Sequence, residues 1–153
     1  MDSFLLRIFR LIFGSNQNDN LVVRKFMKTN CAKLKKTVEK ILSKRKSLEQ
    51  FQQSENFHLK IDEKNLKLSV GKNGNRVTVS KYFERNGDLI PDPDMEFLIG
   101  FDGEWYPVAL QTSTGHYFQA RHWVNGEEFL DLDETLRQVK FANEWARSIG
   151  DAL

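Results

Sequence analysis

Six carboxylate side chains lie close together in the middle of the chain, and carboxylates bind divalent cations or transfer protons. They fall within 17 residues, at Asp88, Asp92, Asp94, Glu96, Asp102 and Glu104. One hypothesis is therefore a metal-dependent hydrolase over residues 88–104. A nuclease of the Pro-Asp type also needs a lysine two residues after its second acid, and no lysine lies between Lys81 and Lys140. Since Asp and Asn favour turns, the same residues also predict a structural turn or an acidic recognition loop.

Other reactive side chains are few. The single cysteine, Cys31, excludes an internal disulfide and a four-cysteine zinc site, and its apolar neighbours indicate a core residue. His116 and His122 are six residues apart on one expected strand, too far apart to share a metal ion. We predict no catalytic residue, no metal site and no cofactor.

Charge is divided unevenly along the 153 residues. The first 50 residues carry 12 Lys and Arg against 4 Asp and Glu, a balance of +8, whereas the others carry 11 against 17, a balance of −6. A basic part joined to an acidic part indicates either charge pairing within the molecule or separate surfaces for two partners.

The basic residues lie on an expected helix at residues 21–50. Met27, Cys31, Leu34, Val38, Ile41 and Leu48 follow one another at spacings of four, three, four, three and seven residues. This pattern predicts a long amphipathic helix, either unbroken or divided into two. Its polar faces carry the candidate nucleic-acid contacts Lys33, Lys35, Lys36, Lys40, Lys44 and Arg45. Such a face could bind nucleic acid without reading its bases, bind an acidic protein or an anionic membrane, or simply be solvated.

The elements around this helix follow from hydrophobic periodicity. Residues 4–13 are apolar almost all round and are followed by a polar linker, so residues 1–20 form a separate segment. We expect residues 4–13 to contact the core or a second copy, and membrane association is unlikely on this pattern. No apolar run reaches the length needed to cross a bilayer, and we expect a cytoplasmic protein.

After residue 54 the hydrophobic period changes from 3.6 to 2. Short alternating runs separated by Gly, Asn and Asp turns predict an antiparallel meander of five to six strands over residues 56–124. A final helix is expected at residues 131–150, capped by Asp131 with Glu134 as the reciprocal partner, and packed on one face of the sheet. Residues 21–153 are thus predicted to form one α+β domain.

Residues 77–97 contain Asn86-Gly87-Asp88-Leu89 followed by Asp92-Pro93-Asp94-Met95. This stretch resembles a family of small bacterial proteins carried on plasmids, conjugative elements or phage-derived elements. The resemblance covers about residues 66–149 and leaves out the basic N-terminal part. It implies an accessory protein that acts by binding, and it brings no catalytic residues. The positions that match the family's motif are Asn86, Gly87, Asp88, Asp92, Pro93 and Glu96.

These observations favour a non-enzymatic binding or accessory protein that contacts a polyanion, either a nucleic acid or an acidic protein, through the basic helix. The first alternative is a protein-interaction or oligomerisation module that uses residues 4–13. The second is the metal-dependent hydrolase at the acidic stretch 88–104.

Overall fold

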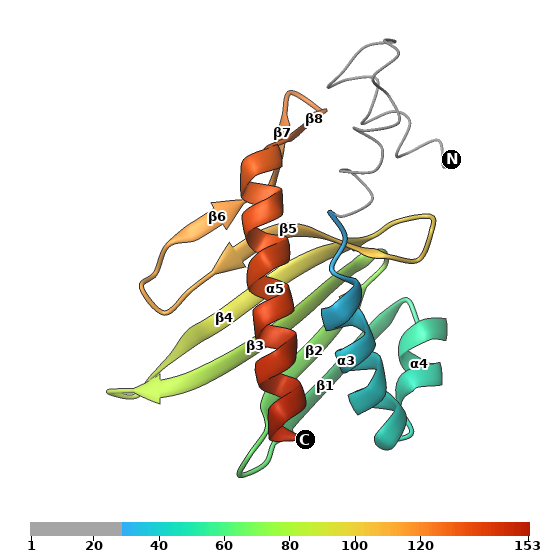
Figure 1. The fold of residues 1–153 in the computed structure, drawn as a ribbon, viewed down its shortest axis with the longest axis vertical. Coiled ribbons are helices and arrows are strands. Elements are labelled where there is room, and N and C mark those ends of the chain that lie inside the picture. Colours follow the sequence, from blue (N-terminus) through green and yellow to red (C-terminus); the bar gives the residue numbers. More distant parts are fainter. Residues whose placement is uncertain (1–28) are drawn as a thin grey trace.

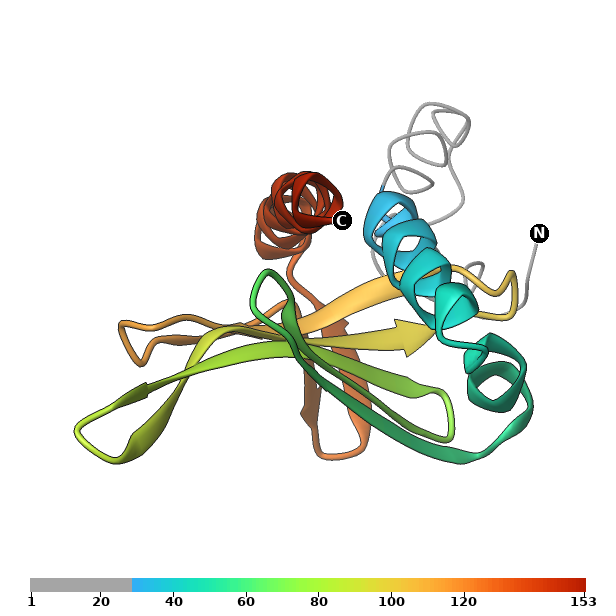
Figure 2. The same ribbon diagram turned by 90° about the horizontal axis from the view of Figure 1, so that it is seen from below.

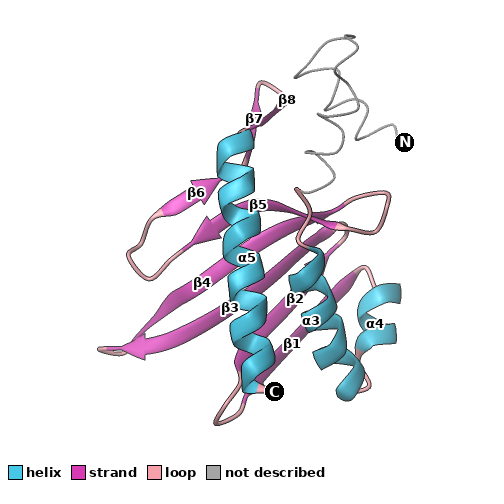
Figure 3. Ribbon diagram, viewed as in Figure 1, coloured by secondary structure: helices cyan, strands magenta, loops and turns pink. Residues whose placement is uncertain are grey.

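The computed structural model describes residues 29–153 and shows helices packed on one face of a sheet (Figures 1 and 3). The predicted α+β class is confirmed. The elements in chain order are α3 (Ala32–Lys44), α4 (Leu48–Gln53), β1 (Asn56–Asp62), β2 (Lys67–Asn73), β3 (Arg76–Arg85), β4 (Asp88–Ile99), β5 (Trp105–Gln111), β6 (Tyr117–Gln119), β7 (Arg121–Val124), β8 (Glu127–Leu130) and α5 (Leu132–Ala152).

The main sheet is an antiparallel meander in which β1 to β6 lie in sequence order, as predicted. Val70 lies opposite Val79, and Val79 lies opposite Met95, so the alternating apolar residues of neighbouring strands share one face. The predicted strand range of 56–124 is wrong at its end. Residues 121–124 leave this sheet and pair with residues 127–130 in a separate two-stranded hairpin, β7–β8.

The core lies between the sheet and the helices. Val77, Val79 and Phe97 of the sheet are completely buried, as are Leu34 and Val38 of α3. The apolar side of α5 completes this layer, and the helix crosses the sheet beside α3 (Figures 1 and 2). The predicted C-terminal helix on one face is therefore confirmed.

Of the two reciprocal hydrogen bonds predicted to cap the N-terminus of α5, one is present. Asp131 accepts a hydrogen bond from the Glu134 backbone N–H at 3.0 Å. The Glu134 carboxylate does not accept a hydrogen bond from the Asp131 backbone, because it accepts hydrogen bonds from Arg137 and Gln138 instead. Among the described residues, no helix combines the length and the hydropathy that a membrane span requires.

A long basic helix over residues 21–50 is not confirmed, because the described part of this stretch is divided between α3 and α4. Helix α3 ends at Lys44, and residues 21–28 lie outside the described range. Lys46 adopts a φ of +58°, and the N–H groups of Lys46 and Ser47 return to the carbonyls of Ser43 and Leu42. These two bonds form a Schellman motif, which closes the end of a helix.

The break lets α4 turn back over the sheet. Phe51 of α4 reaches the core, where its ring centroid lies 5.3 Å from that of Phe57 and 6.1 Å from that of Trp105. Burial of this aromatic side chain offsets the cost of a left-handed lysine at the helix end.

The structural turn or acidic recognition loop expected over residues 88–104 is mostly a strand in the structure. Only Asn86 and Gly87 form the turn, both with positive φ, and the strand β4 begins at Asp88. Pro91 and Pro93 fit in this strand because β4 pairs with β5 only from Asp94 onward. The hairpin of β3 and β4 therefore extends beyond the rest of the sheet (Figure 1).

Candidate functional site

Four of the predicted contact residues form a single exposed row on α3. Lys33, Lys36, Lys40 and Lys44 are all exposed, and their spacings of three, four and four residues place them on one side of the helix. The buried residues Leu34, Val38, Ile41 and Leu42 occupy the other side. We call these four residues the outer lysine row. It is about 16 Å long at 1.5 Å per residue.

The other two predicted residues are held by acids. Lys35 is only 21% exposed, and its Nζ lies 3.8 Å from Glu104 and 3.9 Å from Glu39. Arg45 donates a 2.5 Å hydrogen bond to Glu63. Both side chains are therefore engaged with carboxylates, and the candidate contact surface reduces to the outer lysine row.

The neighbouring helix α5 carries no comparable charge. Its exposed charged residues are of both signs and balance to zero, at Asp133, Arg137, Lys140, Glu144, Arg147 and Asp151. Among residues 29–153, no carboxylate lies within 4.0 Å of a lysine of the row. Within the described part of the helix layer, positive charge is therefore concentrated along α3.

Repulsion between the lysines of the row destabilises α3. Like charges three or four residues apart destabilise a helix by about 0.2–0.5 kcal/mol per pair, so the three neighbouring pairs cost about 0.6–1.5 kcal/mol. A bound polyanion would remove this repulsion. Four ammonium groups can neutralise several phosphates, but they lack the planar fork with which arginine makes bidentate contacts to bases.

The motif residues do not form one site. Asn86, Gly87 and Asp88 lie at the tip of the β3–β4 hairpin, whereas Asp92, Pro93 and Glu96 lie along β4. Glu96 accepts a 2.6 Å hydrogen bond from Arg76.

Three further acids of residues 88–104 each contact a different side chain. Asp94 accepts a hydrogen bond from the Tyr82 hydroxyl, and Asp102 accepts one from Tyr106. Glu104 lies beside Lys35. In the part of the chain that the structure describes, no three His, Cys, Asp or Glu side chains gather to hold a metal ion.

Cys31 is fully buried, as its apolar neighbours predicted. Burial raises the pKa of its thiol well above the ordinary value, so the side chain stays protonated. Its backbone N–H donates to the Trp105 carbonyl at 2.7 Å, which ties the start of α3 to β5.

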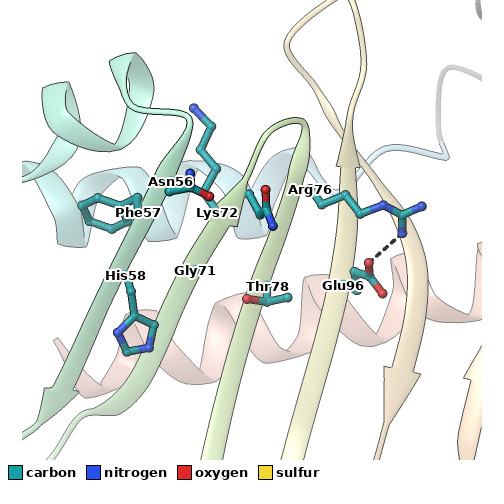
Figure 4. A pocket seen from close by; sticks show the side chains of 9 residues that line it. Asn56, Phe57, His58, Gly71, Lys72, Arg76, Thr78 and Glu96 are labelled. Carbon is teal, nitrogen blue, oxygen red and sulfur yellow. Dashed lines mark hydrogen bonds and ion pairs between the residues drawn. The ribbon is translucent and has the colours of Figure 1, made fainter.

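The open face of the sheet contains a hollow of about 590 Å³ that the sequence did not predict (Figure 4). Gly71 contributes to its floor, because a Cβ there would lie only 2.6 Å from the Thr78 hydroxyl. The charged groups around the hollow are engaged within the protein, since Glu96 pairs with Arg76 and the Lys72 ammonium donates to the carbonyls of Phe51 and Gln52. The lining comes from four strands, and a glycine within a strand was its only sequence signal.

The predicted contact segment 4–13 and the division between residues 20 and 21 lie outside the described residues. No curated protein and no solved structure matches the chain. One family model, a domain of unknown function termed DUF6908, matches residues 36–151 and so covers most of α3 together with the sheet and α5. The chain therefore belongs to the DUF6908 family.

Proposed function

We propose that this protein is a non-enzymatic binding module that holds a polyanion, a nucleic acid, along helix α3. The observation that carries the proposal is the outer lysine row, in which four exposed ammonium groups share one side of a single helix. No described carboxylate balances them within 4.0 Å. Such an arrangement favours phosphate contacts through release of counterions.

The proposal also includes the cellular setting of the protein. The likeness of residues 66–149 to proteins of plasmids and phage-derived elements supports a bacterial accessory protein that acts in the cytoplasm. In this setting the β3–β4 hairpin, with Asn86 and Gly87 at its tip, would contact a protein or stiffen the domain.

The proposal can be tested by fluorescence anisotropy of the full chain with a labelled 24-base-pair DNA between 50 and 200 mM salt. The test variant changes Lys33, Lys36, Lys40 and Lys44 to Gln. A matched control changes Lys60, Lys64, Lys81 and Lys140 to Gln, which removes the same charge from exposed positions elsewhere. Circular dichroism would verify that both variants fold.

We expect the wild type to bind, the control variant to bind with a similar dependence on salt, and the row variant to bind more weakly with a flatter dependence. If the row and control variants lose the same affinity, only net charge matters and the proposal is wrong. Poly-glutamate added at equal charge concentration tests the acidic-protein alternative. Displacement of the DNA as efficient as that by unlabelled DNA would favour an acidic protein instead.

Contact through residues 4–13 stays a prediction, because this segment lies outside the described residues. No observation favours the metal-dependent hydrolase, since four of the six acids of residues 88–104 have separate partners and no three potential ligands gather among the described residues.

A further inference from the structure

We infer that the outer lysine row recognises the backbone of double-helical nucleic acid, without reading its sequence, in preference to single strands. This inference rests on the proposed function and names its ligand. It follows from what α3 presents beside the lysines, from the shape of the helix layer and from the type of cation.

The outward side of α3 has no platform on which bases could stack. Besides the four lysines it carries Thr37 and Ser43, and no aromatic side chain. Proteins that bind single strands combine their positive charge with aromatic side chains, each worth about 1–3 kcal/mol per stacked base. The row lacks this contribution.

Exposed aromatic side chains in the described part of the chain lie elsewhere. Trp123 and Phe129 belong to the β7–β8 hairpin, which stands on the face of the sheet opposite the helices (Figure 2). Tyr82 and Phe83 belong to the β3–β4 hairpin. Phe101 is nearer to α3, but it shares its loop with the carboxylates of Asp102 and Glu104, which repel phosphates.

The shape of the helix layer also favours a duplex. Helices α3 and α5 lie side by side on the same face of the sheet, and the row is on the side of α3 away from its buried residues (Figure 2). A flexible single strand is usually held in a groove that follows its backbone, whereas a rigid duplex can lie against a straight ridge. A row of about 16 Å matches a length of duplex axis that carries about five phosphates of each strand, since each strand has one phosphate per 3.4 Å of axis.

The cations of the row are all lysines, and this predicts indifference to base sequence. A lysine can contact guanine in the major groove, but the planar groups that read bases through paired hydrogen bonds are those of arginine, asparagine and glutamine. None of these planar side chains occurs on the outward side of α3. A lysine ammonium acts as a point charge and binds phosphates of any sequence.

The two kinds of ligand differ in their expected salt dependence. Four phosphate contacts contribute about −3.6 to the slope of log affinity against log salt for a duplex, and about −2.8 for a single strand. Between 50 and 200 mM salt these slopes correspond to losses of about 150-fold and about 50-fold. Because residues 1–28 carry further basic residues, the informative quantity is the difference between the wild type and the row variant.

The test compares one 24-nucleotide strand of mixed sequence with its duplex, and that duplex with a second one of unrelated sequence, by anisotropy with the full chain. We expect tighter binding to the duplex, equal affinity for both duplexes, and a slope difference of about 3.6 between wild type and row variant. Equal or tighter binding of the single strand would overturn the inference and leave the proposed function standing. Strong preference for one duplex sequence would overturn the claim that bases are not read. A complete lack of binding at 50 mM salt would overturn both proposals.

Discussion

The buried ion pair at the base of the β7–β8 hairpin allows a sharp prediction about stability. The Arg121 side chain is only 2% exposed, and its guanidinium donates a 2.6 Å hydrogen bond to Glu128, which is 21% exposed. The guanidinium also lies 5.8 Å from the centre of the Tyr106 ring. Burial lowers the pKa of Arg121, and the Glu128 carboxylate opposes that shift. We therefore predict that the hairpin depends on Glu128 to balance a buried charge.

Substitution of Glu128 and substitution of Arg121 should have different effects on the free energy of unfolding. Glu128→Gln keeps the shape of the side chain but removes the negative charge beside the buried Arg121 guanidinium, and breaking a buried pair in this way costs about 3 kcal/mol. Arg121→Met removes the buried charge and leaves Glu128, which is 21% exposed and can be hydrated. This second change should cost about 1 kcal/mol or less, because it leaves no uncompensated charge in the interior.

Urea unfolding followed by circular dichroism measures both effects. With a slope of about 2 kcal/mol/M, Glu128→Gln should lower the midpoint by about 1.5 M. Glu127→Gln is the matched control, because the neighbouring acid is exposed and its loss should change stability by less than about 0.5 kcal/mol. If Arg121→Met proves more destabilising than Glu128→Gln, then packing of the arginine, and not charge balance, holds the hairpin, and the reasoning fails.

Two further predictions concern the sheet. Gly71→Ala should lower the free energy of unfolding by about 1 kcal/mol, because the new Cβ would lie 2.6 Å from the Thr78 hydroxyl. The same change made together with Thr78→Ala should be neutral or stabilising, and an equal cost in both backgrounds would show that the two residues do not interact. Burial and the hydrogen bond to Asp102 raise the pKa of Tyr106, so the folded state holds this proton more tightly than the unfolded state. The contribution of Tyr106 to stability should therefore be constant below the ordinary tyrosine pKa of about 10 and fall as the pH rises above it. Thermal melts at pH 8 and pH 11 measure this fall, and Tyr106→Phe should reduce it.

Strand positions could be predicted because alternation is a local property. Val77 and Val79, or Leu68 and Val70, reveal their buried face without knowledge of the rest of the chain. The end of α3 could not be predicted in this way. A Schellman motif usually has glycine at the left-handed position, whereas here Lys46 takes it, and the cause is the distant core contact of Phe51 with Trp105.

The prolines of β4 misled the sequence interpretation for a similar reason. Pro91 and Pro93 indicate a turn unless one knows that β5 begins its pairing at Asp94 and leaves the adjoining part of β4 unpaired on that side. The β7–β8 hairpin was missed because its short strands follow directly after β6. Its presence explains why β5 is buried on both faces, a feature that the continuous apolar run Trp105–Leu110 already indicated.

The candidate site was partly predictable. The spacing of Lys33, Lys36, Lys40 and Lys44 is a property of the helix, and the sequence alone contains it. Lys35 and Arg45 are removed from the candidate contact surface by their ion pairs with Glu104 and Glu63. Only the fold brings these two acids to α3.

The uneven charge of the chain left two possibilities, pairing within the molecule or separate surfaces. The ion pairs of residues 29–153 favour the second. Four of them join residues that all come after position 51: Lys67 with Asp62, Arg76 with Glu96, Arg121 with Glu128, and Arg137 with Glu134. Only Lys35 and Arg45 reach acids of the later part from the basic part. The acidic part thus pairs with three of its own arginines, and no acid of the described residues balances the outer lysine row. This is the charge distribution expected if the partner of α3 is not another part of the described domain.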